Sequence, residues 1–214
     1  MKPLLKALEI SHSFDYQLFE NVSLAIYEGE SVSIVGRSGS GKSTILHILS
    51  TLLKPQKGKV FYKDKNIYSL KEKELLNIRR YEMGIIFQAH YLFKGFTGFE
   101  NIRIASLISQ KPIYKNLLEK LEIENVLKKN VGDLSGGQQQ RISIARVLVK
   151  QPKIIFADEP TGNLDKETSD AVMEVLFDYV KSVKGALFLV THDEELASRC
   201  SQAYRLKNKT LESI

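Results

Sequence analysis

The sequence predicts an α/β domain with a central, mostly parallel β-sheet, a peripheral antiparallel sheet and an inserted helical segment. The first observation is a set of three short apolar runs, each suited to a buried strand and each followed by a polar residue, at 84–87, 154–157 and 186–190. The second is an extended β-branched run, 31–35, that leads into a glycine-rich loop and then a helical pattern. The third is the stretch 89–149, in which apolar residues recur at helical spacing.

The composition is that of one compact globular chain. A chain of 214 residues can bury about 70% of its unfolded surface without help from disulfides or metals. The single cysteine, Cys200, allows no internal disulfide and is typical of a reducing compartment. No stretch approaches 18 apolar residues and the charged N-terminus is unlike a signal peptide, so we expect no membrane span here. The net charge of +6 comes from lysines spread along the chain, which favours a solvated surface over nucleic-acid binding.

The N-terminal part of the chain is expected to be rich in strands. Residues 4–10 and 18–26 have strand composition and precede the run at 31–35. After a polar turn, Val60–Tyr62 and Asn66–Tyr68 are predicted as short strands of the peripheral sheet, and a helix is predicted from about Lys71 to Arg80.

The glycine-rich loop matches the pattern G-x-x-x-x-G-K-[ST] at every fixed position, between a strand and a helix. Its glycines let the backbone aim successive N–H groups into one concavity, and the following helix adds its own N-terminal donors, so the loop is suited to a polyphosphate. Lys42 is expected to reach the β- and γ-phosphates, and the Ser43 hydroxyl to ligate Mg²⁺. The residues predicted to bind the phosphates are Gly36, Arg37, Ser38, Gly39, Ser40, Gly41, Lys42, Ser43 and Thr44.

Two aromatic residues, Phe14 and Tyr16, lie upstream of this loop. Either one could stack on a nucleotide base, a contact worth about 1–3 kcal/mol. Packing against the sheet is an equally good interpretation of both residues from the sequence alone.

Polar residues at the ends of the apolar runs are candidates for the chemistry. The carboxyl ends of parallel strands meet at one edge, so Gln88, Asp158, Glu159 and His192 are predicted to converge on the phosphate loop. Adjacent carboxylates are costly unless an ion or a proton occupies the site between them. Asp158 is predicted to bind Mg²⁺ directly or through water, Glu159 to orient and deprotonate an attacking water, and His192 to be functional because of its position.

The segment 89–130 has a different character. Large apolar residues at 91–93 and 96–99 lie in a loop-like stretch, and those from Tyr114 to Val126 repeat at helical spacing. We interpret the segment as an inserted helical lobe with an apolar surface for a partner; the alternative is that its aromatic residues only pack the lobe.

A second possible anion site begins at Leu134. Ser135 is a good N-cap, and Ile142, Ala145 and Val149 form a helical face behind it. A Ser-Gly-Gly start on a helix can bind a phosphate, or it can be an ordinary intrachain cap. Further on, a turn over 160–165 is followed by an amphipathic helix to Lys181, and 204–212 is predicted to form a closing hairpin.

With these motifs in this order, the sequence resembles the nucleotide-binding subunit of ABC transporters over nearly its whole length. The resemblance implies a P-loop NTPase (RecA-like) core with a peripheral antiparallel β-sheet and an inserted α-helical subdomain. It implies a single ABC ATPase domain, 1–214, in which 1–87 and 150–214 form mostly the catalytic core and β-subdomain. The helical subdomain with the signature motif would span about 89–149.

The same resemblance assigns roles to individual residues. It makes 36–44 the Walker A loop, Gln88 the Q-loop glutamine, Glu159 the catalytic glutamate and His192 the switch histidine. Lys42 is counted with the catalytic residues. The remaining assignments are Asp165 in the D-loop, Ser43, Gln88 and Asp158 at Mg²⁺, the Walker B strand Ile154–Asp158, and the signature residues Leu134, Ser135, Gly136, Gly137 and Gln138.

The family architecture implies that two subunits sandwich two ATP molecules head to tail. Ser135 and Gly137 of one chain would then contact the γ-phosphate held by the Walker A loop of the other. The family usually stacks a tyrosine on adenine, and here Phe14 matches that place better than Tyr16, keeping the stacking face without the hydroxyl.

Within the family, the stretches 96–101 and 157–165 look most like the bacterial group of lipoprotein-releasing ATPases, MacB-type exporters and FtsE-type cell-division ATPases. The resemblance to the lipoprotein-releasing type implies an ATPase that powers a separate integral membrane permease from the cytoplasmic face of the inner membrane. The alternatives are an FtsE-like regulator, a MacB-type exporter ATPase and, supported only by the positive charge, a soluble ABC ATPase acting on nucleic acid or ribosomes. We expect no nucleic-acid partner.

Overall fold

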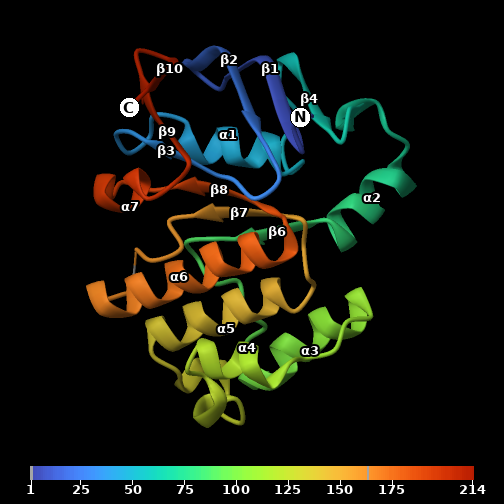
Figure 1. Ribbon diagram of the computed structural model, residues 1–214, viewed down its shortest axis with the longest axis vertical. Helices are drawn as coiled ribbons and strands as arrows, with labels where there is room; N and C mark the ends of the chain where they lie inside the picture. The colour runs from blue at the N-terminus through green and yellow to red at the C-terminus, as the bar shows by residue number, and fades with distance from the viewer. Residues whose placement is uncertain (1, 163) are drawn as a thin grey trace.

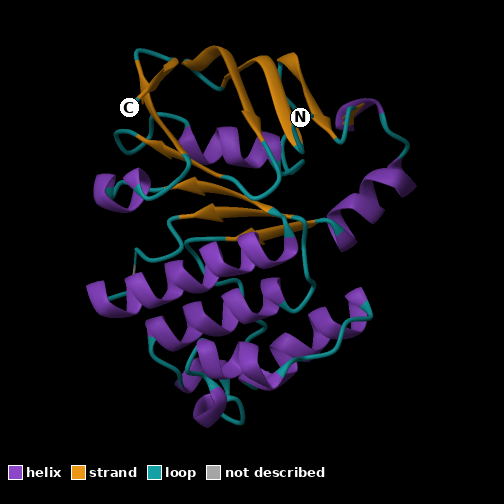
Figure 2. Ribbon diagram, viewed as in Figure 1, coloured by secondary structure: helices purple, strands orange, loops and turns teal. Residues whose placement is uncertain are grey.

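The computed structural model describes residues 2–162 and 164–214. Asn163, in one of the stretches that carry the resemblance, lies outside the described residues. Two β-sheets with a helix between them occupy one half of the molecule in Figures 1 and 2, and most of the helices occupy the other half. In the described part of the chain, no helix combines the length and the apolar character needed to cross a bilayer.

The central sheet has the strand order β10-β9-β3-β8-β7-β6. Its members are β3 (Ser31–Val35), β6 (Met83–Ile86), β7 (Ile154–Asp158), β8 (Ala186–Val190), β9 (Gln202–Lys207) and β10 (Thr210–Ser213). All its neighbouring pairs are parallel except β9 and β10, which form an antiparallel hairpin. The peripheral sheet, β2-β1-β4-β5, is antiparallel and consists of β1 (Leu5–Ser13), β2 (Gln17–Ile26), β4 (Lys57–Tyr62) and β5 (Lys65–Asn66). The predicted α/β class, with a second antiparallel sheet, is confirmed.

Helices cover both faces of the central sheet (Figure 1). Helix α1 lies between the two sheets, whereas α5 and α6 cover the opposite face of the central sheet and α3 and α4 lie beyond them. The bounds are α1 (Lys42–Leu49), α2 (Glu72–Tyr81), α3 (Gly98–Ser109), α4 (Lys115–Lys120), α5 (Gly136–Leu148), α6 (Lys166–Val183) and α7 (Glu194–Ser198), with 3₁₀ turns at Ile67–Ser69, Glu124–Val126 and Val131–Asp133.

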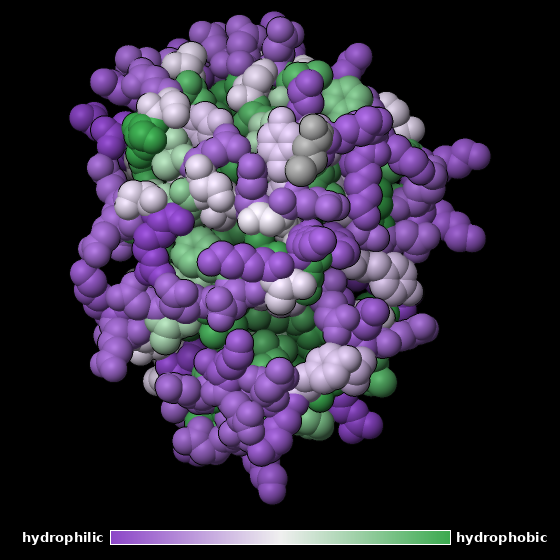
Figure 3. Space-filling model, viewed as in Figure 1, coloured by the Kyte–Doolittle hydropathy of each residue, from purple (hydrophilic) through white to green (hydrophobic). Residues whose placement is uncertain are grey.

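The central strands are buried on both faces because they separate two hydrophobic cores. Alternate residues of a strand point to opposite faces, so Ile154 and Phe156 of β7 pack with α1 and the peripheral sheet, while Ile155 and Ala157 pack with the helices. This double burial explains why the strands are apolar throughout instead of alternating. The outer surface in the same view is mainly hydrophilic, with hydrophobic residues visible between the helices (Figure 3).

Two expectations of local structure are wrong. The strand predicted over Asn66–Tyr68 ends at Asn66, whose side chain accepts a hydrogen bond from the Tyr68 backbone N–H (3.2 Å) and caps a 3₁₀ turn. The loop-like stretch 96–99 contains the start of α3, because Thr97 and Glu100 form a capping box in which each side chain accepts from the other's backbone N–H. Helix α7 was not predicted at all.

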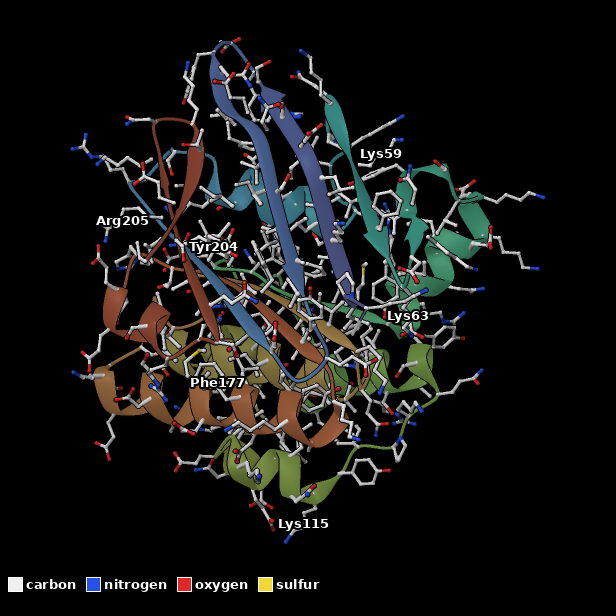
Figure 4. All side chains as sticks on the ribbon, turned by 45° about the horizontal axis from the view of Figure 1, so that its top comes forward. Lys59, Lys63, Lys115, Phe177, Tyr204 and Arg205 are labelled. Carbon is white, nitrogen blue, oxygen red and sulfur yellow. The ribbon has the colours of Figure 1, made fainter. Side chains whose placement is uncertain are left out.

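Glu82, between α2 and β6, ties the peripheral sheet to the central one. Its carboxylate accepts hydrogen bonds from Tyr62 Oη (2.8 Å) and Lys63 Nζ (2.9 Å), both at the end of β4, where Figure 4 labels Lys63. Burial by itself would raise the pKa of Glu82, but the hydrogen bonds from Lys63 and Tyr62 outweigh it, and the pKa lies below its usual range.

Glu82→Gln is therefore expected to lower the free energy of unfolding at pH 7 by about 0.5–1 kcal/mol, given the partial exposure of the pair. A carboxyl with a lowered folded-state pKa stabilises the fold above its unfolded pKa of about 4.3 and loses that contribution as the pH falls further. Urea unfolding of both proteins should thus show a difference at pH 7 that closes below about pH 4. The matched control is Asp64→Asn, which removes the exposed pair with Lys2 and should cause no measurable change; a pH-independent difference for Glu82→Gln would contradict the assignment.

Candidate functional site

A cavity of about 440 Å³ lies at the carboxyl edge of the central sheet. Its volume is in the range of small-molecule sites. The phosphate loop, the ends of β6, β7 and β8, and the connection between β1 and β2 all contribute to it. The lining residues are Phe14, Tyr16, Leu18, Ser38, Gly39, Gly41, Lys42, Ser43, Thr44, Gln88, Asp158, Glu159, Val190 and His192. The structure therefore brings together the phosphate loop and all four polar residues predicted at the strand ends.

The phosphate loop depends on glycine at two positions. Gly39 (φ 74°) and Gly41 (φ 106°) have left-handed backbone conformations that other residues rarely adopt. A Cβ atom on Gly41, the N-cap of α1, would also lie 3.2 Å from side-chain atoms of both Leu18 and Phe19. The loop can therefore lie directly against β2.

Lys42 is buried and folded back over its own loop. Its Nζ donates to the carbonyl oxygens of Gly36 (2.9 Å) and Arg37 (3.1 Å). These bonds satisfy the ammonium group and hold the start of the loop against α1. The loop is thus closed around the lysine.

The cavity has oxygen donors suited to Mg²⁺. Ser43 Oγ donates to Asp158 Oδ1 (3.0 Å), which places the start of α1 beside the end of β7, and Gln88 lines the same cavity. Hydroxyl, carboxylate and amide oxygens are ligands that this hard cation accepts. Among the described residues, no group of three or more His, Cys, Asp or Glu side chains could hold a metal. A set of one hydroxyl, one carboxylate and one amide oxygen fits Mg²⁺, which usually keeps several waters and binds substrate phosphates.

Glu159 is held by two side chains from the end of β8. Its Oε1 lies 3.0 Å from His192 Nδ1, and its Oε2 accepts from Thr191 Oγ1 (3.3 Å). Its backbone is left-handed (φ 47°), which turns the chain sharply after Asp158. Asp158 and Glu159 have separate hydrogen-bond partners, Ser43 and Thr191; the ion or proton expected between the two carboxylates stays a prediction.

Phe14 and Tyr16 lie at the mouth of the cavity, with 63% and 64% of their surfaces exposed. Packing into the sheet, the alternative left open by the sequence, does not occur for either residue. The Phe14 ring makes an edge contact with His12 at a centroid distance of 4.9 Å. Both rings are therefore available to a ligand.

Several predicted site residues lie outside this cavity. Gly36, Arg37 and Ser40 line a neighbouring cavity of about 660 Å³. Asp165 caps α6, accepting from Thr168 N (2.9 Å). The segment Leu134–Gln138 does not line the cavity of its own chain. There, Ser135 and Gln138 form a capping box at the start of α5, so the intrachain cap considered from the sequence is present.

Sequence reasoning did not identify Leu18, Thr191 or Val190 as parts of the site. Leu18 contributes an apolar wall and Thr191 a hydrogen bond to Glu159. The position of Thr191, directly before His192 at a strand end, was the only available signal for its role. Leu18 could not be separated in the sequence from the other apolar residues of β2.

The fold and the site define an ATP-binding cassette, and the chain belongs to the ABC transporter family, whose pattern matches residues 19–162. It is an ATPase, the ATP-binding subunit of a transporter.

Its relatives include lipoprotein-releasing system ATP-binding proteins LolD. The protein from Bdellovibrio bacteriovorus is 39% identical over 215 residues, covering 95% of this chain and 98% of the relative. The protein from Treponema denticola is 41% identical over 203 residues, covering 92% and 90%. A solved dimeric ATP-binding cassette in a post-hydrolysis state, bound to ADP and phosphate, superposes with a TM-score of 0.89 at 33% identity, covering 97% of this chain and 96% of that one. A second dimeric structure of a bacterial ABC transporter cassette gives 0.88 at 34%, with the same coverage.

Proposed function

We propose that this chain is the ATPase of a lipoprotein-releasing type transporter, acting as a head-to-tail dimer on a separate permease at the cytoplasmic face of the inner membrane. The similarity to LolD proteins over nearly the full length of both chains supports the subgroup. The observation that carries the dimer is the position of Leu134–Gln138, which the cavity of the same chain does not include. We infer that Leu134–Gln138 contacts the ATP bound by a second copy of the chain, and the dimeric state of the similar cassettes supports this.

In this proposal the phosphates of ATP lie along the loop from Gly36 to Thr44. Lys42 exchanges the carbonyl oxygens of Gly36 and Arg37 for the β- and γ-phosphates. Ser43, Asp158 and Gln88 would hold Mg²⁺, which when bound neutralises charge on the phosphates.

Glu159 is the general base. Its carboxylate accepts the proton of the attacking water. The hydrogen bond from Thr191 and the His192 ring, whose Nδ1 lies 3.0 Å from Oε1, fix its orientation. A positioned base of this kind contributes about 10²- to 10⁴-fold to the rate.

The start of α5 provides the contact to the ATP of the partner subunit. Ser135 and Gly136 are exposed there, and the N-terminus of a helix favours an anion. The capping box between Ser135 and Gln138 fixes the first turn of the helix and uses the backbone N–H groups of these two residues. Asp165, at the start of α6, belongs to the same proposed interface.

The adenine ring stacks on Phe14 in this proposal. Phe14→Ala is expected to raise the Kd for ATP by about 5- to 150-fold, since one base–aromatic contact is worth about 1–3 kcal/mol, whereas Phe14→Tyr should bind as the wild type does. Tyr16→Ala is the matched variant, because Tyr16 is as exposed as Phe14 and lines the same cavity. Titration with a fluorescent ATP analogue measures all three affinities, and a larger loss for Tyr16→Ala would move the stacking role to Tyr16.

A groove between the helical lobe and the core is the surface that fits a permease segment. It has a volume of about 340 Å³ and is lined by Ser50, Leu52, Arg79, Met83, Ile85, Phe93, Ile104, Ala105, Ile108, Arg146, Val147 and Lys150. Three of these side chains are cationic, and none of the described residues lining it is acidic. Leu52, Phe93 and Ile108 are exposed large hydrophobic residues. An amphipathic helix with apolar and acidic side chains would complement this groove.

The test of the function is recovery of the partner. Tagged Glu159→Gln protein with ATP and Mg²⁺ should retain a permease with a large extracytoplasmic domain from detergent-solubilised membranes, identified by mass spectrometry. Phe93→Asp should reduce that recovery at least about tenfold, because it removes an apolar contact and places a carboxylate opposite the acidic side chains proposed for the partner. Tyr114→Asp is the control, since Tyr114 is equally an exposed aromatic residue but lines a different groove, between α4 and α6.

The identity of the recovered partner separates the alternatives. A cell-division membrane protein would favour an FtsE-like regulator, and an exporter permease would favour a MacB-type ATPase. Ribosomes or nucleic acid without a membrane protein would contradict the transporter proposal and leave the ATPase assignment intact.

A further inference from the structure

The loop that follows Gln88 is fastened to one side of α5. The carbonyl oxygen of His90 accepts from Ser143 Oγ (3.2 Å) and from Arg146 Nη2 (3.1 Å), and the carbonyl oxygen of Tyr91 accepts from Arg146 Nη1 (2.7 Å). Residues three apart on a helix project from the same side, so the contacts form one row. The loop therefore moves with α5.

Gln140, one turn nearer the start of α5, connects this loop to a second one. Its side chain is only 2% exposed. Its Nε2 donates to the carbonyl oxygen of Pro160 (2.7 Å), and its Oε1 lies 2.5 Å from Nδ1 of His90. Pro160 directly follows Glu159, so a single buried amide bridges the loop after Gln88 and the turn after Glu159.

The chemistry of the bridge leaves only one arrangement of its atoms. A carbonyl oxygen can only accept, so the amide nitrogen of Gln140 must face Pro160 and the amide oxygen must face His90. That oxygen also only accepts, so Nδ1 of His90 carries the hydrogen. Losing the contact of Gln140 with either His90 or Pro160 leaves a buried polar group unpaired, which is costly. The bridge therefore resists separation of the loop after Gln88 from the turn after Glu159.

We propose that Gln140 is a positioning residue for ATP hydrolysis, which holds the turn that presents Glu159 and makes its placement depend on the loop after Gln88. This inference rests on the role of Glu159 as the base in the proposed function. The left-handed backbone of Glu159 (φ 47°) needs support from its surroundings, and the hydrogen bond to the next carbonyl is part of that support. Phe93 and Arg146 line the groove proposed for the permease, so a displacement there reaches His90 and, through Gln140, the base.

Steady-state ATPase kinetics test the proposal. Gln140→Leu and His90→Ala are each expected to lower kcat by about tenfold or more with little change in KM, because a small displacement of a catalytic group is enough for such a loss. His90→Asn should recover most of the activity, since its Nδ2 can donate from nearly the position of the histidine Nδ1. The double variant His90→Ala/Gln140→Leu should be no slower than Gln140→Leu alone, because both changes break the same bridge.

Ser143→Ala is the matched control. It removes one hydrogen bond from the same loop, but Arg146 still donates to the His90 carbonyl and the bridge is untouched, so its kcat should be near that of the wild type. An unchanged kcat in Gln140→Leu, or an equal loss in His90→Asn and His90→Ala, would overturn the proposal.

Amide hydrogen exchange of the nucleotide-free protein gives a readout that does not depend on activity. His90→Ala should speed exchange of the Glu159 and Gly162 amides, although His90 bonds to neither residue; an effect confined to the loop after Gln88 would overturn the bridge. Failure of the proposed function looks different. In that case Glu159→Gln would hydrolyse ATP as the wild type does, while His90→Ala would still speed amide exchange at Glu159 and Gly162.

Discussion

Glu159→Gln is expected to reduce ATP turnover by at least about 100-fold while ATP still binds, because glutamine keeps the shape of the side chain but cannot accept a proton from water. Its amide oxygen can still accept from Thr191, which donates to the carboxylate in the wild-type protein. The site should therefore keep its geometry and lose its base.

The two parts of this expectation have separate measurements. Phosphate release gives kcat, and equilibrium titration gives the Kd for ATP, which should stay within about threefold of the wild-type value. With hydrolysis blocked, the dimer closed by ATP should accumulate, and light scattering after gel filtration should detect a doubled mass. Glu119→Gln, which changes an exposed carboxylate on α4, controls for the charge; wild-type turnover in Glu159→Gln would remove Glu159 from the role of base.

Lys42→Ala is expected to weaken ATP binding by about 10- to 100-fold, because the lost charge-assisted hydrogen bonds are worth about 1.5–3 kcal/mol. The ammonium group lies within the loop and donates to the carbonyl oxygens of Gly36 and Arg37. Its removal therefore takes away a contact to phosphate and also the two bonds that keep the loop closed.

Lys42→Met separates the loss of these hydrogen bonds from the loss of buried side-chain volume, because methionine fills much of the same space without the charge. Both variants should show little stabilisation by ATP in thermal melts, whereas the wild-type protein gains stability as ATP exceeds its Kd. Binding of ATP to both variants with wild-type affinity would refute the assignment of the phosphate loop.

The sequence was most informative where one local pattern determines the structure. The double burial of the central strands makes them continuous apolar runs, so β3 and β8 have the bounds expected of them, and parallel pairing brings Gln88, Asp158 and His192 to one edge. The helix at Gly98 was missed although Thr97 and Glu100 carry a capping-box pattern, because the flanking aromatic residues concealed the helical period. The roles of the individual site residues, and the division of the chain into subdomains, stay predictions.

Other parts of the site could not be read from the sequence because they depend on contacts between distant segments. Gln140 stands among three consecutive glutamines, and nothing in their order shows which one is buried between His90 and Pro160. The exposure of Phe14 and Tyr16 likewise depends on how the connection from β1 to β2 lies over the phosphate loop. Such features require the folded chain.

The strand order of the central sheet has a consequence for synthesis of the protein on the ribosome. Strand β3, which leads into the phosphate loop, pairs on one side with β8 and on the other with β9, and these are translated about 155 and about 170 residues after it. Until they emerge, the strand beneath the nucleotide site has two open edges, and such long-range pairing is slow and vulnerable to aggregation. A nascent chain that ends before β8 should therefore be unable to bind ATP, and it depends on chaperones or rapid elongation during that interval.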